Sequence, residues 1–161
     1  MDETTPEEYH LDPGYIYFSR IPAVVRTVVG SCVAVCLWDP ERKHGGISHF
    51  MYPFVREPSQ ATAQYGNVAI AALVRIMEEA GSENDALLAQ IVGGASPGNK
   101  SEEDVGTQNV TMARKMLKRK RVTVVSEDVG GMMGRKLVFS TDTGELAILK
   151  VRRLRDTDWI R

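Results

Sequence analysis

The chain has 161 residues, of which 43% are hydrophobic and 25% charged, and its formal net charge is −1. These values are typical of one globular domain and exclude a disordered chain, a collagen-like repeat and a coiled-coil rod. The N-terminal residues are acidic and polar, no run of 18 apolar residues occurs, and two cysteines are too few for a disulfide scaffold. We therefore expect a cytoplasmic protein with no membrane insertion.

In chain order, the apolar pattern predicts strands, a helix, a strand, a second helix and further strands after a loose, flexible leader over residues 1–13. The expected strands are 15–18, two within 24–38 around a Gly30-Ser31 turn, 46–52, 87–92, 122–125, 136–140 and 146–151. The expected helices are 66–80 and one that Thr107 or Asn109 caps. This order indicates a mixed α/β sheet protein, with one domain over 14–155 and a tail over 156–161.

Charge is unevenly distributed along the chain. Residues 1–113 carry 7 basic and 15 acidic side chains, whereas residues 114–161 carry 13 basic and 6 acidic ones. The basic run over 114–121 has two interpretations: a solvated helix C-terminus, where the helix dipole favours cations, or a docking patch for an acidic partner. Interleaved aromatic side chains for base stacking are absent from this run, so we expect no nucleic-acid partner.

Gly30-Ser31-Cys32 is the first candidate for chemistry, because a cysteine after a glycine turn can expose its sulfur beside backbone N–H groups. A cysteine nucleophile needs a base, and histidine is the usual one. A hairpin centred between Pro40 and Glu41 would place His49 opposite Cys32. In the alternative interpretation, Cys32 is a small buried core residue and His49 a core histidine with its hydrogen bonds satisfied. The sequence favours the catalytic and the structural interpretation about equally.

Two further patterns have structural interpretations beside functional ones. Cys36 follows Cys32 by four residues, but a structural zinc site needs more ligands than this, so we expect no metal and assign Cys36 to the core. Gly93-Gly94-Ala95 matches no phosphate loop and is either a tight turn or the wall of a cleft where a substrate comes close.

Several ordered blocks resemble the CheD family of chemotaxis proteins. The most specific are GSCVAVCLWDP from residue 30 and GGISHFMYP from residue 45. They are followed by YGNVA from 65, IVGGA from 91, GTQNV from 106, EDVGG from 127, GRK from 134 and DTG from 142. The resemblance covers about residues 14–151.

The resemblance implies a chemoreceptor glutamine deamidase with a mixed β-sandwich flanked by two main helices, as in the deamidating domain of cytotoxic necrotizing factor toxins. It makes Cys32 the nucleophile and His49 the general base, without a cofactor. From the residues themselves, we expect the substrate contacts to be Gly30, Ser31, Gly93, Gly94 and Ala95. The implied partners are methyl-accepting chemotaxis receptors, at whose arrays the protein would act, and a CheC-type phosphatase. We expect a monomer.

One position departs from the family pattern. Its active-site threonine stands six residues before the cysteine, where this chain has Arg26, whereas Thr27 stands five residues before. Adjacent strand residues point to opposite faces, so only one of the two can reach His49, and we assign the role to Thr27. Two other functions stay open: an adaptor that binds receptors or a phosphatase with little or no catalysis, and another cysteine hydrolase such as a peptidase.

Overall fold

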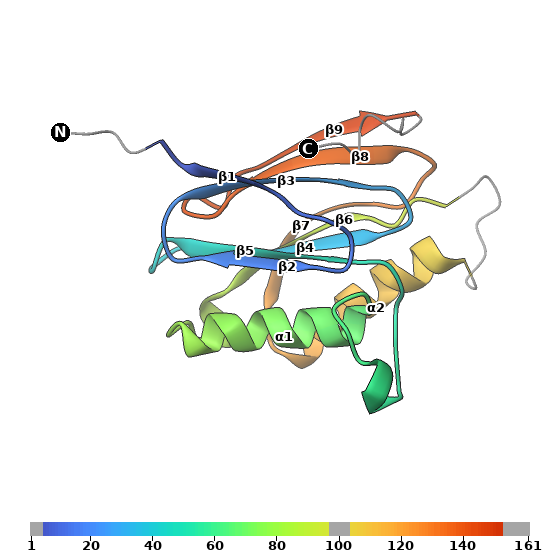
Figure 1. Cartoon of the computed structure of the whole chain (residues 1–161), viewed down its shortest axis with the longest axis horizontal. Helices are drawn as coiled ribbons and strands as arrows, with labels where there is room; N and C mark the ends of the chain where they lie inside the picture. Colours follow the sequence, from blue (N-terminus) through green and yellow to red (C-terminus); the bar gives the residue numbers. More distant parts are fainter. Residues whose placement is uncertain (1–4, 97–103, 153–161) are drawn as a thin grey trace.

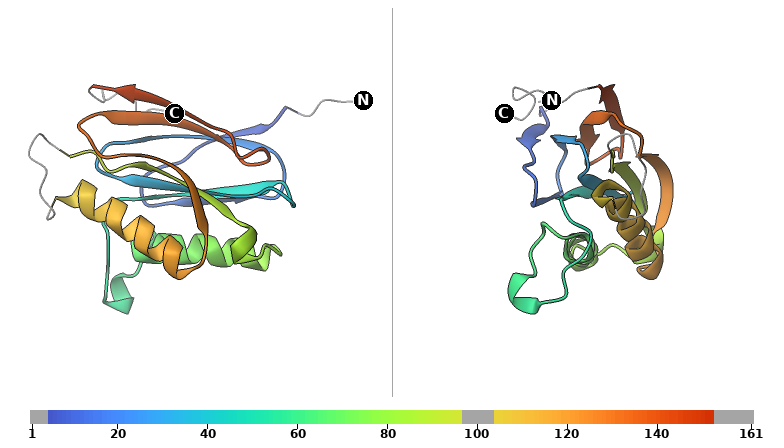
Figure 2. Two further views of the ribbon diagram at one scale, coloured as in Figure 1. Left: turned by 180° about the vertical axis from the view of Figure 1, so that it is seen from behind. Right: turned by 90° about the vertical axis from the view of Figure 1, so that its right-hand side faces the viewer.

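The computed structural model describes residues 5–96 and 104–152. Within these ranges the chain forms three layers: a four-stranded sheet, a five-stranded sheet and two main helices (Figure 1). The two views of Figure 2 show the five-stranded sheet in the middle, with the helices on its outer side. This arrangement confirms the predicted mixed α/β sandwich with two main helices. No helix in the described ranges is long and apolar enough to cross a membrane.

Both sheets are mixed. The four-stranded sheet has the order β1 (Glu7–His10), β3 (Ala23–Val29), β8 (Gly134–Ser140) and β9 (Leu146–Val151). The five-stranded sheet has the order β2 (Ile16–Ser19), β5 (His44–Phe50), β4 (Val33–Asp39), β6 (Leu88–Gly93) and β7 (Thr123–Val129). Only β1–β3 and β6–β7 pair in parallel among these neighbours. The helices are α1 (Gly66–Glu79) and α2 (Val105–Arg119), with short 3-10 turns η1 (Pro58–Gln60) and η2 (Asn84–Ala86).

Two hydrophobic cores lie on the two faces of the middle sheet. Along β4, Val33, Val35 and Leu37 pack toward the helices, whereas Ala34 and Cys36 pack toward the four-stranded sheet. A strand covered on both faces is apolar throughout instead of alternating, which explains why this segment is almost uninterrupted in hydrophobic residues. The prediction that Cys36 belongs to the core is confirmed, because its side chain is fully buried.

The leader prediction is wrong for residues 7–11. β1 pairs in parallel with the edge of β3, with Glu7 opposite Ala23. Leu11 then turns inward, is completely buried, and donates its amide to the carbonyl of Arg26 at 2.9 Å. One apolar anchor and one strand pairing therefore order a segment whose composition is mostly polar. Residues 1–4 and 153–161, including the predicted tail, lie outside the described residues, and the single-domain assignment of 14–155 stays a prediction.

The start of α2 also differs from the prediction. Asp104 is the N-cap, and its carboxylate accepts a hydrogen bond from the amide of Thr107. Thr107 and Asn109 therefore lie within the helix rather than at its cap. An aspartate is among the best N-cap residues. The glycine two residues later, Gly106, made the first turn of the helix look like a loop in the sequence.

Candidate active site

The segment Gly30–Cys32 carries the chain from β3 in one sheet to β4 in the other. We call it the nucleophile loop after the role predicted for Cys32. Gly94 and Ala95 hold it from behind, because their amides donate to the carbonyls of Cys32 and Gly30, both at 2.9 Å. Gly93 has φ +117°, and a Cβ on it would stand 2.3 Å from the carbonyl oxygen of Cys32. The Gly93-Gly94-Ala95 segment thus supports the loop, and its predicted contact with substrate stays a prediction.

Asn109 on α2 joins the nucleophile loop to the end of β5. Its Nδ2 donates to the carbonyl of Ser31 at 2.9 Å and to that of Met51 at 3.0 Å. The side chain is completely buried. Sequence reasoning considered Asn109 only as a helix cap. The signal that could have found it is the position of Asn109 on the buried, apolar face of α2, which it shares with Val110 and Ala113. A buried polar side chain at such a position needs a hydrogen-bond partner.

His49 lies in β5, completely buried, and its ring meets a side chain from the opposite sheet. Thr27 Oγ1 on β3 stands 2.8 Å from His49 Nδ1. Arg26 points the other way, is about half exposed, and lies 3.5 Å from the carboxylate of Glu8. The structure therefore brings Thr27, and not Arg26, to the histidine.

The contacts of Thr27 also define the proton positions on His49. The Thr27 hydroxyl has a single hydrogen, which it donates to the carbonyl of Leu11 at 2.8 Å. The same oxygen must therefore accept a hydrogen bond from His49, so Nδ1 carries the proton. The lone pair then lies on Nε2, which is buried and has no hydrogen-bond partner among the described residues. An imidazole in this tautomer is arranged to accept a proton at Nε2.

Cys32 does not lie directly opposite His49, so the predicted register is wrong. The partner of His49 in β4 is Ala34, two residues further along. The cause is a longer turn: Asp39 pairs with His44, and Lys43 closes the turn with φ +54°. A shift of two residues preserves the face of the sheet, so Cys32 still points into the space between the sheets and packs against the core there.

Burial keeps the Cys32 thiol and the His49 imidazole neutral. Desolvation raises the pKa of the Cys32 thiol to about 11, and the cysteine's own amide opposes this only in part. Desolvation also lowers the pKa of His49 to about 4, helped by the nearby charge of His10. At neutral pH the resting site therefore holds a thiol and a neutral imidazole.

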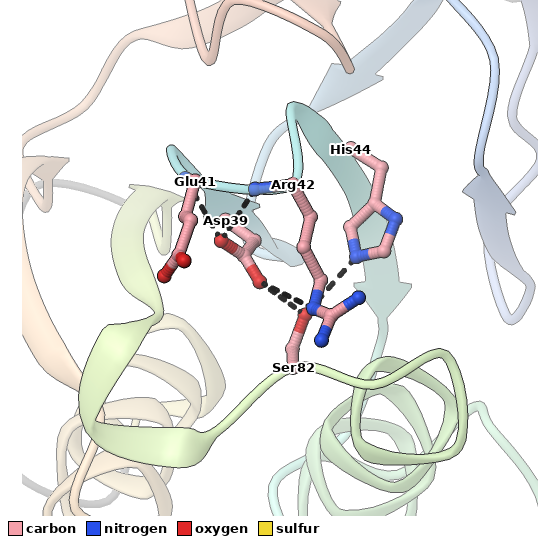
Figure 3. A network of polar contacts seen from close by, with 5 residues as sticks. All are labelled: Asp39, Glu41, Arg42, His44 and Ser82. Atoms are coloured by element: carbon pink, nitrogen blue, oxygen red, sulfur yellow. Dashed lines mark hydrogen bonds and ion pairs between the residues drawn. The ribbon is translucent and has the colours of Figure 1, made fainter.

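A second polar network lies at the far end of β4 and β5 (Figure 3). Ser82 donates to the carboxylate of Asp39 at 2.6 Å, so its oxygen accepts from His44 Nε2 at 3.0 Å. Burial raises the pKa of Asp39, but hydrogen bonds from Ser82 and from the backbone of Arg42 and Glu41 outweigh it and lower the pKa overall. The serine proton faces aspartate and not histidine, so this cluster ties the hairpin to the end of α1 and does not activate a nucleophile.

No group of three or more His, Cys, Asp or Glu side chains in the described ranges is arranged to hold a metal ion. Cys36 is fully buried between the sheets. The groups that the site offers are the Cys32 thiol, the oriented imidazole of His49 and the backbone amides of the nucleophile loop.

Comparison with known proteins places this chain in a family. The family model described as CheD chemotactic sensory transduction matches residues 52–150. A probable chemoreceptor glutamine deamidase CheD of Sulfurimonas denitrificans is 33% identical over 91% of this chain and 96% of its own length. Another of Anaeromyxobacter dehalogenans, named CheD 1, is 40% identical over 85% of this chain and 81% of its own length.

A third relative carries the same printed name and comes from Methanococcus maripaludis, with 34% identity over 84% of this chain and 90% of its own length. A solved structure of a Neisseria meningitidis protein is only a distant likeness, with a TM-score of 0.38 and 13% identity over 68% of this chain and 53% of that protein. By the family model and the relatives together, this chain belongs to the CheD family.

Proposed function

We propose that this chain is a chemoreceptor glutamine deamidase in which Cys32 is the nucleophile, His49 the general base and Thr27 the residue that positions the imidazole. One observation carries the proposal: the Leu11–Thr27–His49 hydrogen bonds leave a buried Nε2 lone pair with no partner among the described residues, on a ring that lies between the same two sheets as the Cys32 side chain. The names of the CheD relatives supply the substrate, a glutamine side chain of a chemoreceptor.

The reaction needs two proton transfers through His49. The Cys32 thiol gives its proton to Nε2 as the sulfur attacks the carboxamide carbon of the substrate glutamine. The C–N bond then breaks, and ammonia leaves with the proton from Nε2, so that a thioester remains. Water next gives a proton to Nε2 and attacks the thioester carbon. The C–S bond breaks, the sulfur recovers the proton, and the product is glutamate.

The amides of Ser31 and Cys32 are the candidates for stabilising the oxyanion. Neither donates to another backbone group in the described ranges, because the loop is held through its carbonyls instead. Donors that are fixed before substrate arrives stabilise a tetrahedral intermediate without reorganisation. The support from Gly94, Ala95 and Asn109 fixes the loop in this way.

The neutral resting pair has a consequence for selectivity. A thiol with a pKa of about 11 is a weak nucleophile toward small electrophiles in solution. It becomes reactive when a bound amide brings its carbon to the sulfur while Nε2 takes the proton. We expect the protein to act in the cytoplasm at receptor arrays, as a monomer, with a CheC-type phosphatase as a further partner. An adaptor without catalysis is the rival function, favoured by the basic side chains of α2.

Peptide mass mapping of a chemoreceptor cytoplasmic fragment tests the function. We expect a glutamine-to-glutamate mass shift after incubation with the intact chain and none with Cys32→Ala. Cys36→Ala is the matched control, since it removes the other thiol from the same strand region and should keep turnover. Deamidation by Cys32→Ala would refute the assignment of the nucleophile. Binding of the fragment without any mass shift would favour the adaptor, and backbone cleavage would indicate a peptidase.

A further inference from the structure

A groove runs between α2 and the segment that follows β5. Its larger part has a volume of about 620 Å³, and it continues toward the end of α2 in a part of about 380 Å³. Both parts share Phe54, Met112 and Lys115. We call it the α2 groove and define it by six of its lining residues: Phe54, Thr107, Thr111, Met112, Lys115 and Arg119.

Four of these residues form a stripe along α2. Thr107, Thr111, Lys115 and Arg119 follow one another at intervals of four, so they lie on neighbouring turns of one helix face. The stripe spans 12 residues, which corresponds to about 18 Å at a rise of about 1.5 Å per residue. Small threonines stand at one end and cations at the other, with the apolar side chains of Phe54 and Met112 between them.

The threonine end of the stripe lies at the start of α2, next to the segment that supports the nucleophile loop: a Cβ on Gly106, beside Thr107, would stand 2.3 Å from the carbonyl oxygen of Ala95. Asn109, two residues after Thr107, holds the carbonyl of Ser31 in the nucleophile loop. Its second bond reaches the carbonyl of Met51, and the chain from there leads directly to Phe54 in the groove. A segment lying along the stripe would therefore have one end beside the nucleophile loop.

The other end of the groove carries positive charge that is not neutralised. Arg114, on another side of α2, is paired with Glu127 at 2.6 Å. Lys115 and Arg119 form no ion pair with the described residues, and no acidic side chain lines the two parts of the groove in those ranges. Such a surface attracts a carboxylate-bearing partner.

We propose that the α2 groove receives the helix that carries the target glutamine, and that this helix presents an acidic side chain to Lys115 and Arg119. Lys115 and Arg119 lie 8 and 12 residues from Thr107, about 12 and 18 Å along the axis. The carboxylate of the partner helix therefore stands about two to three turns from the glutamine, on the same face. The inference rests on the proposed function, because it assigns recognition of the substrate to a surface next to the site.

Charge reversal on α2 tests the inference. Lys115→Glu and Arg119→Glu are compared with Lys118→Glu, which makes the same charge change in the last turns of the same helix but lies outside the groove. With a receptor cytoplasmic fragment as substrate, we expect each groove variant to lower kcat/KM at least tenfold through KM, with kcat unchanged. Lys118→Glu should change kcat/KM less than twofold.

A compensating change sharpens the test. Replacing the acidic side chain two to three turns from the modified glutamine by lysine should restore most of the activity of Lys115→Glu. Equal kcat/KM for groove and control variants of an active enzyme overturns the inference. If the unaltered chain does not deamidate the fragment, the proposed function fails instead. In that case the inference is tested by binding: the Kd of the same fragment is measured for Cys32→Ala with and without the Lys115→Glu or Arg119→Glu substitution. Equal Kd values overturn the inference.

Discussion

Replacing Thr27 by valine removes one hydroxyl from between the two sheets and keeps the shape of the side chain. The hydroxyl serves two buried groups: it donates to the Leu11 carbonyl and accepts from His49 Nδ1, both at 2.8 Å. Valine can serve neither. Because these atoms are enclosed by the sandwich, water has no free access to replace the hydroxyl.

The expected magnitudes follow from this count. Each buried group left without a partner costs about 1–3 kcal/mol, so we expect the free energy of unfolding to fall by about 2–6 kcal/mol. For a domain of this size that lowers Tm by roughly 5–20 °C. The imidazole also loses the contact that keeps the proton on Nδ1. An interaction of about 1–3 kcal/mol lost in the transition state lowers kcat about 5- to 150-fold.

Three measurements check the reasoning, with Thr27→Ser as the control that retains the hydroxyl. Thermal unfolding gives the stability change, and deamidation of a receptor fragment gives kcat. Imidazole ¹⁵N chemical shifts report the tautomer of His49 directly. We expect the Nδ1–H form in the unaltered chain and in Thr27→Ser, and a mixture in Thr27→Val. An Nε2–H imidazole in the unaltered chain would refute the assigned direction of proton transfer, whatever the activity of the variants.

Three further outcomes are expected. Because burial raises the pKa of Cys32 to about 11, its alkylation rate by iodoacetamide should rise about tenfold per pH unit between pH 7 and 10; a rate that is flat over this range would indicate a preformed ion pair. Gly93→Ala should abolish turnover by displacing the loop carbonyl that its Cβ would meet at 2.3 Å. Gly130→Ala is its control, with φ +77° and no atom within 4 Å of the Cβ, and should cost stability but not kcat. Asn109→Asp should lower kcat at least tenfold, because it places a carboxylate against two carbonyl oxygens. Its control is Asn84→Asp, which also loses a hydrogen bond to a carbonyl but should lower only Tm. Equal loss of kcat in both variants would contradict a positioning role for Asn109.

Much of the fold could be predicted because its signals are local. The buried run of β4 and the three-to-four spacing of Leu73 and Met77 in α1 are readable without knowing any partner. Turn geometry is less local. The turn after β4 holds two more residues than expected because the Asp39 carboxylate accepts the amides of Glu41 and Arg42 and fixes the turn around itself.

The site was predictable only in part, for a physical reason. Cys32 directly precedes β4, whose partner strand β5 holds His49, so alternation extended by one residue placed both on one face despite the wrong register. The choice between Arg26 and Thr27 depends on which face of β3 looks across to another sheet, and the apolar residues around them do not reveal this. Asn109 contacts residues 58 and 78 positions away, and no local pattern encodes such a distance.

The placement of Thr27 and His49 in different sheets couples chemistry to the completeness of the fold. Neither sheet orients the imidazole by itself, because the hydroxyl and the ring come from different sheets, and the Leu11 carbonyl that fixes the hydroxyl comes from a third segment near the N-terminus. A loosened state that keeps its strands and helices but separates the layers would lose the contact that orients the imidazole. The deamidation rate would thus fall before far-ultraviolet circular dichroism registers any loss of secondary structure. The deamidation rate would then report how closely the two sheets pack against each other.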